Sequence, residues 1–356
     1  MSGSFHLAMD PYLFCLPDPC RSAEQLEGFV RGLIGWSEVL RRPRIRVLVS
    51  DVCRAALIED GEYPYQHRLR DLLQKFGCEY ADHETVCRVL QNIIERTPSL
   101  EEEMGIGVVL FDENDTSVRP ELFLSRLKSR TRSALIEMLI VLVSRYCWGP
   151  LCNEKAIIAS ALETTDVDGW DGEIEVSGEI MGIEWTDASY QTPCKFPVKT
   201  TDIFRAVDGF DSLNRHIGAW NLWQNAEDET AATDAIGQTI MQLVRSGLDG
   251  GRRVSYRLGT EFLKTARQWG FGNRSDYAML LIESCARIVL GYPKNPLKEF
   301  RMSKGSGNQV VRKDGALAYR TRLTRKGAGF RLMLWKLVDG TIEFANVGDK
   351  DELLIC

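Results

Sequence analysis

Three aspartates follow short apolar runs in the N-terminal part of the chain: Asp10, Asp51 and Asp112. If these runs are strands of one parallel sheet, their carboxyl ends meet at one edge, and the three carboxylates converge there. Clustered carboxylates are suitable ligands for Mg²⁺ or Mn²⁺, which would support metal-dependent phosphodiester hydrolysis. The alternative is structural, because Asp10 and Asp51 stand where helix N-caps stand and Asp112 opens a polar turn.

A second set of candidate residues is basic and lies between residues 294 and 336. This stretch holds twelve Lys or Arg against two acids, a net charge of +10, whereas the whole chain carries −6. Such a split favours contact with an anion, either nucleic-acid phosphate or an acidic protein surface, which includes the chain's own acidic segment. The residues predicted to contact nucleic acid are Lys304, Arg312, Lys313, Tyr319, Arg320, Arg322, Arg325, Lys326, Arg331 and Trp335.

The elements that must position these basic residues are three β-strands. Apolar residues recur with a period of two over residues 316–324, 330–338 and 341–347. Asp339-Gly340 between the last two runs is a strong signal for a two-residue hairpin turn. The sequence therefore predicts a C-terminal antiparallel β-meander.

The pleat of this meander decides which side chains share a face. Arg320 and Arg322 alternate with Tyr319, so the two arginines are expected on one face of their strand. Arg331 and Trp335 alternate likewise in the next strand. The sheet is thus expected to present a row of arginines to phosphates, with Trp335 nearby for base stacking.

The meander resembles the C-terminal half of RelE/ParE-type toxins. The residues that carry the likeness are Tyr319-Arg-Thr-Arg-Leu, Phe330-Arg-Leu-Met-Leu-Trp335, Asp339-Gly and Ile342-Glu-Phe-Ala-Asn-Val-Gly348. In that family an arginine-bearing strand leads into a hairpin and a final strand ending in Val-Gly. The likeness covers about fifty of the 356 residues.

This resemblance implies roles for individual residues. The RelE branch cleaves mRNA with basic residues and a tyrosine rather than a metal. On that pattern Arg320, Arg322 and Arg331 would stabilise phosphate charge, and Lys304 or Tyr319 would assist proton transfer. The chain as a whole looks like a component of a bacterial defence system.

The order of apolar runs and helical patterns indicates an α/β plus α+β protein. Residues 1–150 alternate helix and strand signals and are predicted to form a parallel-sheet α/β domain. Residues 206–292 read as helices that end on Gly247, Gly270 and Gly291. Residues 293–356 form the basic β-meander.

Residues 151–205 differ from their surroundings in charge. Nine acids and no Lys or Arg occur between Glu163 and Asp187, and glycines punctuate the short alternating runs. We interpret this part as an acidic β or loop connector between the larger modules.

No apolar run is long enough to span a bilayer, and the first residues lack the pattern of a secretory signal. The ten cysteines contain no C-x-x-C pair, which is typical of buried thiols in a reducing compartment. A cytoplasmic protein without membrane contact is therefore expected.

Three functions are compatible with these patterns. The first is a nucleic-acid-associated subunit of a multi-protein bacterial assembly, plausibly in phage defence, that binds RNA or DNA through the meander. The second is a metal-dependent nuclease that uses Asp10, Asp51 and Asp112. The third is a non-enzymatic adaptor whose oppositely charged surfaces bind partner proteins.

Overall fold

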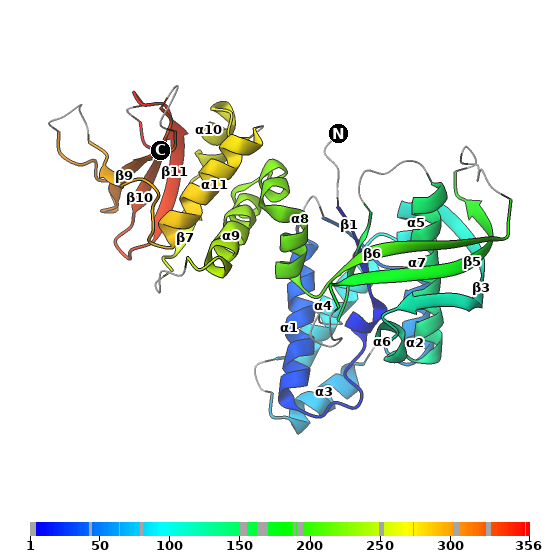
Figure 1. The fold of residues 1–356 in the computed structure, drawn as a ribbon. Coiled ribbons are helices and arrows are strands. Elements are labelled where there is room, and N and C mark those ends of the chain that lie inside the picture. Colours follow the sequence, from blue (N-terminus) through cyan, green and yellow to red (C-terminus); the bar gives the residue numbers. More distant parts are fainter. Residues whose placement is uncertain are drawn as a thin grey trace. The chain divides into compact units, whose positions relative to one another are not determined.

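The computed structural model describes the chain apart from residues 1–4, 43–44, 64, 79–80, 150–154, 162–169, 188–189, 191–194, 249–252, 273, 302–306, 325–328 and 353. The chain divides into two compact units, Met1–Ser212 and Leu213–Cys356 (Figure 1).

A six-stranded mixed sheet forms the centre of the first unit. Its strands are β1 (Phe5–Met9), β2 (Ile45–Leu48), β3 (Ile106–Arg119), β4 (Ile157–Ala159), β5 (Glu173–Trp185) and β6 (Val198–Val207). They lie in the order β2-β1-β4-β6-β5-β3. Strands β2, β1, β4 and β6 run parallel to one another, whereas β5 is antiparallel to both β6 and β3. The predicted parallel-rich α/β arrangement is confirmed.

Helices connect and cover these strands. They are the 3₁₀ helix η1 (Pro11–Phe14), α1 (Ala23–Val39), α2 (Asp51–Glu59), α3 (Gln66–Lys75), α4 (His83–Arg96), α5 (Leu100–Met104), α6 (Leu122–Ser125) and α7 (Ser129–Trp148). Several begin at a side chain that accepts a backbone N–H of the first turn, as Ser22 accepts from Gln25 and Asp82 from Thr85.

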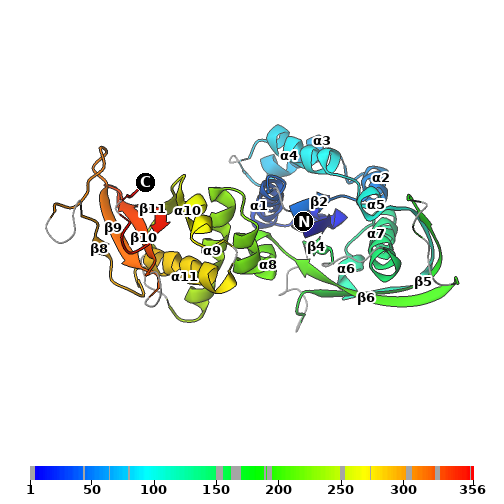
Figure 2. The ribbon, with the colours of Figure 1, turned by 90° about the horizontal axis from the view of Figure 1, so that it is seen from above.

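Helix α7 is the core element of the first unit. It is buried over most of its length, and Leu135, Leu139 and Leu142 have no exposed surface. It packs against α2 and against β3, β5 and β6. Figure 2 shows the long strands β5 and β6 curving around it. A helix that is apolar on nearly all sides requires this enclosure.

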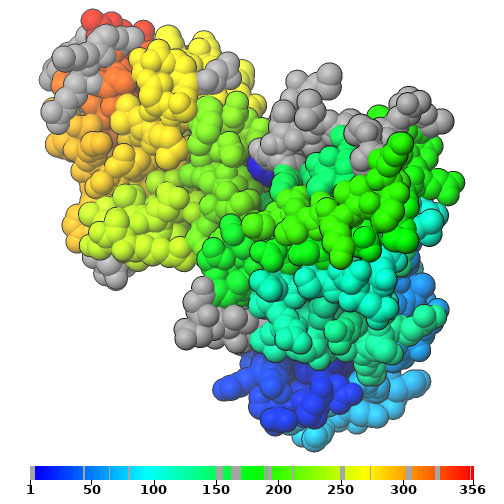
Figure 3. Space-filling model, turned by 45° about the vertical axis from the view of Figure 1, so that its right-hand side comes forward, coloured from blue at the N-terminus to red at the C-terminus, as the bar shows by residue number. Residues whose placement is uncertain are grey.

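Strand β3 differs from the short strand expected over residues 106–111. It continues through Asp112 to Arg119. The polar residues after Asp112 interrupt the regular pairing with β5 without ending the strand, and the pairing resumes at Ser117. Burial alternates along β5, so one face of this sheet packs on α7 and the other faces outward. Figure 3 shows the β5 and β6 region, in green, as a broad part of the visible surface.

The segment predicted as an acidic connector is part of the first sheet where the structure describes it. Strands β4, β5 and β6 all lie within or next to residues 151–205, and β6 joins the parallel strands to the antiparallel pair. The two units therefore divide the chain differently from the four predicted segments. The sequence did not indicate that this segment belongs to the first sheet, because β5 pairs with β3, which lies about 70 residues earlier in the chain.

Helices form one layer of the second unit. They are α8 (Phe210–Gln224), which begins just before the boundary between the units, α9 (Glu229–Arg245), α10 (Phe262–Gln268) and α11 (Ser275–Val289). The glycines Gly247, Gly270 and Gly291 follow the last three with φ of 90°, 83° and 79°. The predicted glycine stops are thus confirmed, since this conformation is easily adopted only by glycine.

A five-stranded sheet forms the other layer. Its strands are β7 (Tyr256–Leu258), β8 (Lys298–Glu299), β9 (Leu317–Arg322), β10 (Arg331–Lys336) and β11 (Ile342–Gly348), in the order β7-β11-β10-β9-β8. The predicted antiparallel meander is confirmed as β9, β10 and β11. Gly340 has a φ of 87° in the predicted Asp339-Gly340 turn. The edge strands β7 and β8 were not expected.

Among the residues that the structure describes, no helix combines the length and the apolar character that crossing a membrane requires.

Candidate nucleic-acid interface

The two faces of the meander have different environments. Leu332, Leu334 and Phe344 face the helices and form one core with Phe262 and Leu281. The neighbouring residues point to the opposite face, where Met333 and Trp335 form a small second cluster with Phe300 and Ala345. Functional side chains that must reach a large ligand belong on this second face, because helices cover the first.

Three arginines share this second face and are called the arginine cluster here: Arg320, Arg322 and Arg331. Arg322 lies directly opposite Arg331 in the register of β9 and β10, and Arg320 lies opposite Met333. Directly opposed residues of antiparallel strands project to the same side of a sheet. The sequence had placed Arg320 and Arg322 on one face, and the register adds Arg331 to them.

Lys298 extends the cluster, and sequence reasoning did not select it. This exposed residue lies opposite Arg320 on the edge strand β8. Its position depends on the pairing of a two-residue strand with β9, for which the sequence holds no periodic signal. Its place within the +10 stretch was the only available indication.

The arginine cluster has few polar partners. No ion pair joins any of its three members to an acid within the described residues, although its neighbours Arg301 and Arg312 are paired. The Nε–H groups of Arg320 and Arg331 are buried and donate to no partner in that part of the chain. Buried polar atoms are normally hydrogen-bonded, so these two guanidinium groups are incompletely satisfied within the described residues.

The electrostatics of Arg331 show the same excess of positive charge. Burial, together with the positive charges of Arg320 and Arg322, lowers the pKa of Arg331, and only Asp351 opposes this effect. The side chain nevertheless stays charged at neutral pH, because the guanidinium pKa is far above that range. An added phosphate would offset this repulsion and could accept two parallel hydrogen bonds from one guanidinium.

Arg312 has a structural role instead of the predicted contact role. Its guanidinium donates to Asp314 at 2.8 Å and to Glu343 at 2.6 Å. These hydrogen bonds raise its pKa further above the ordinary value of arginine. Lys313 is exposed in the neighbouring turn. Arg312 therefore fixes the turn before β9, and its charge is already compensated.

The two predicted aromatic residues do not join the arginine cluster. Trp335 is 4% exposed, and its indole N–H donates to the backbone oxygen of Cys356 at 2.7 Å, so base stacking on Trp335 is excluded in this conformation. Tyr319 lies opposite Leu334 and packs on the helix-covered face. It is therefore not on the same face as the arginines whose chemistry it was expected to assist.

Three further predicted contact residues lie outside the described residues: Lys304, Arg325 and Lys326.

Asp10 has the structural role that its sequence context allowed. It is fully buried, caps η1 by accepting the backbone N–H of Tyr12 at 3.0 Å, and forms an ion pair with Arg126. Burial raises the pKa of Asp10, although the charge of Arg126 opposes this shift. The Arg126 guanidinium is itself held over the Tyr12 ring. These contacts leave the Asp10 carboxylate enclosed by protein groups.

Asp51 and Asp112 are placed apart from this pair. Asp51 is the first residue of α2, behind the N-cap Ser50, and pairs with Arg54 at 2.7 Å. Asp112 accepts the backbone N–H of Asn114 at 2.9 Å within β3, the edge strand at the other end of the sheet from β2.

The described residues contain no group of three or more His, Cys, Asp or Glu side chains that could hold a metal ion. The predicted convergence of the three aspartates on Mg²⁺ or Mn²⁺ is therefore not found. The reason is topological: β3 pairs antiparallel with β5, so Asp112 lies within a long strand and not at the shared edge of the parallel strands.

The chain was also compared with known proteins. No protein-family model, curated protein or solved structure gave a significant match.

Proposed function

We propose that the chain binds the phosphate backbone of nucleic acid through the arginine cluster. The observation that carries the proposal is the gathering of Arg320, Arg322 and Arg331 on one sheet face, where no acid forms an ion pair with any of them among the described residues. Arg322 lies directly opposite Arg331, which adds a third positive charge without an added acid. Clustered arginines suit phosphate because each presents a planar fork of donors.

The burial of Trp335 indicates that binding would involve phosphates and not bases. Phosphate contacts position a nucleic acid but carry no sequence information. Since Trp335 is buried and Tyr319 faces the helices, this face offers no aromatic platform for bases among the residues described. Binding through the arginine cluster is thus expected to depend on charge and to tolerate many sequences, RNA or DNA.

An acidic protein surface, which includes the chain's own acidic segment, is the alternative partner for the cluster. Of the described acids in that segment, Glu175 forms an ion pair with Arg119 at 3.7 Å. Membership of a larger bacterial assembly, expected from the general look of the chain and its RelE-like tail, stays a prediction. Co-purification with the products of neighbouring genes would test it.

Fluorescence anisotropy with labelled RNA and DNA of several sequences tests the proposal. Arg320→Gln with Arg322→Gln should weaken binding about tenfold to a hundredfold, because each lost charged contact costs about 1 kcal/mol or more. The matched control is Arg245→Gln with Lys336→Gln, which removes two charges from exposed residues of α9 and β10 outside the cluster.

Equal affinities of the cluster variant and the control would overturn the proposal. If wild-type protein bound neither RNA nor DNA, an acidic protein surface would become the better candidate partner.

A further inference from the structure

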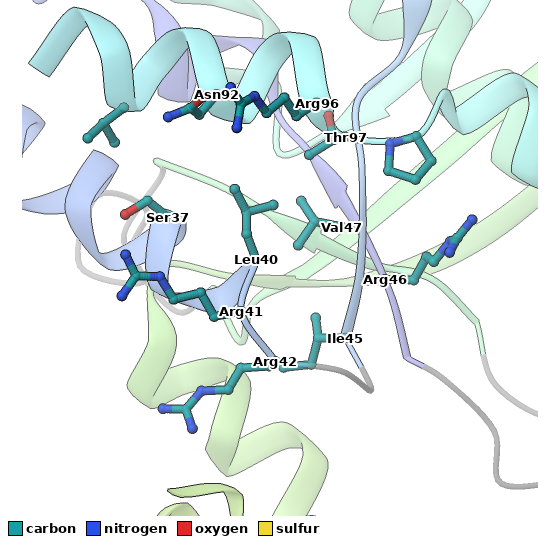
Figure 4. Close-up of a pocket in the computed structure, with 12 residues that line it drawn as sticks. Ser37, Leu40, Arg41, Arg42, Ile45, Arg46, Val47, Asn92, Arg96 and Thr97 are labelled. Atoms are coloured by element: carbon teal, nitrogen blue, oxygen red, sulfur yellow. The ribbon is translucent and has the colours of Figure 1, made fainter.

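A cavity of about 520 Å³ opens in the first unit, between the end of α1, the start of β2 and the last turns of α4 (Figure 4). This volume is in the range of small-molecule sites, about 300–1,000 Å³. Its described lining residues include no Asp or Glu and four arginines, which are Arg41, Arg42, Arg46 and Arg96.

Two of these arginines are already engaged. Arg46 pairs with Glu103 at 3.0 Å, and the Arg42 guanidinium lies 5.2 Å from the centre of the Phe210 ring. Figure 4 shows both side chains pointing away from the middle of the cavity. They contribute positive charge to the cavity, but their donors are directed elsewhere.

Arg41 and Arg96 are available to a ligand. Both side chains are exposed, and neither has an ion pair with any residue in the described ranges. In Figure 4 Arg41 lies beside Ser37, and Arg96 lies beside Asn92 on the facing helix. The Ser37 hydroxyl donates to the backbone oxygen of Ile34 at 2.7 Å.

The net charge of the cavity is positive even after the negative groups near its arginines are subtracted. The carboxyl ends of α1 and α4 each present about half a negative charge, which together offset about one of the four arginines. Glu103 offsets a second one through Arg46. About two positive charges then remain, which suits a phosphate group.

Most of the remaining lining of the cavity is apolar. Leu40 and Val47 lie between the two polar sides in Figure 4, and Ile45, Val89 and Pro98 also belong to this part of the lining. A bare inorganic anion would leave this apolar surface unused. A ligand that joins a phosphate to a flat apolar body uses both parts, as a nucleotide does.

We propose that this cavity binds a free nucleotide, with its phosphates between Arg41 and Arg96 and its base against Leu40 and Val47. The site lies in a different unit from the arginine cluster and does not depend on it.

Calorimetric titration of the full chain with ATP tests this site. The titration uses protein that carries Arg320→Gln and Arg322→Gln, so that the arginine cluster does not contribute. Adding Arg41→Gln and Arg96→Gln should weaken ATP binding at least tenfold. The matched control is Arg88→Gln, which removes an exposed charge from the same helix α4 outside the cavity and should leave the affinity unchanged.

Competition experiments distinguish a free nucleotide from a bare phosphate chain and from a nucleic-acid strand. Adenosine should compete poorly, and tripolyphosphate should compete more weakly than ATP because it lacks the apolar body. Equal binding by the four-residue variant and its parent, or no binding of ATP by the parent, would overturn the proposal. So would an oligonucleotide without a terminal phosphate that displaces ATP as well as ATP displaces itself, since the cavity would then be a contact for a nucleic-acid strand.

Discussion

Arg331 and Arg322 are directly opposed across β9 and β10, a placement that disfavours the folded state. Like charges in opposed positions of antiparallel strands cost about 0.2–1 kcal/mol. Arg331 is also partly buried, which adds to the cost of its charge. Residues that destabilise a fold in this way are typical of functional sites, where a ligand supplies the missing compensation.

Replacing Arg331 by Gln should therefore stabilise the second unit while it weakens nucleic-acid binding. At low ionic strength we expect the free energy of unfolding to rise by about 0.2–1 kcal/mol, because one opposed pair of like charges is removed. The gain should shrink in high salt, which screens the repulsion. Thermal unfolding at two salt concentrations measures both effects, and a loss of stability at low salt would contradict this assignment.

At the residue scale, the sequence predicted which face carries Arg320 and Arg322, because alternation along one strand is a local property. It did not predict the pairing of Arg312 with Glu343, which brings together residues 31 positions apart. It also missed the burial of Trp335 and the hydrogen bond from its indole N–H to the backbone oxygen of Cys356. Arg41, Arg42 and Arg46 are close together in sequence and were a visible signal for the cavity, but Arg96 is supplied by another helix.

Glu343 holds several elements of the second unit together. It lies on β11 and pairs with Arg257 on β7 and with Arg312 in the turn before β9. Burial would raise the pKa of Glu343, but the hydrogen bonds and charges of Arg312 and Arg257 outweigh it and hold the pKa below the ordinary value. The carboxylate therefore contributes stability in its ionised form.

This contribution should be present above about pH 4.5, where the unfolded chain is ionised, and should disappear as the pH falls through the lowered folded pKa. Glu343→Gln should cost about 1.5–3 kcal/mol at pH 7, because charged hydrogen bonds are lost. The cost should decrease as the pH falls below about 4.5 and through the folded pKa. Chemical denaturation of both proteins across this pH range provides the measurement, and an unfolding cost independent of pH would contradict the role given to Glu343.

Elements were predictable where their signals are local. The hairpin at Asp339-Gly340 and the glycine ends of α9, α10 and α11 follow from residues next to one another in sequence. The edge strands β7 and β8 have three and two residues and form only because β11 and β9 offer them free edges. The pairing of β3 with β5 was not predicted either, because it also joins segments that are far apart in the sequence.

The whole molecule consists of two compact units, each with a hydrophobic core of its own. The core of the first is built around α7, and that of the second lies between its helices and the meander. The arginine cluster belongs entirely to the second unit. Units with separate cores are expected to fold separately.

Fragments 1–224 and 208–356, which both retain α8, should each unfold in one cooperative transition. Fragment 208–356 should bind nucleic acid about as tightly as the full chain, whereas fragment 1–224 lacks the arginine cluster. Calorimetry and anisotropy on the two fragments measure these properties. Loss of cooperative unfolding in both fragments would show that neither core is sufficient by itself.

The salt dependence of nucleic-acid binding tests the central claim most directly. Three or four phosphate contacts from the arginine cluster and Lys298 predict a slope of log affinity against log salt of about −2 to −3.5. Arg320→Gln with Arg322→Gln should reduce the magnitude of this slope by about 1.5–2, and Arg245→Gln with Lys336→Gln should leave it unchanged. A slope that is the same in all three proteins would contradict the assignment of the arginine cluster as the phosphate-binding site.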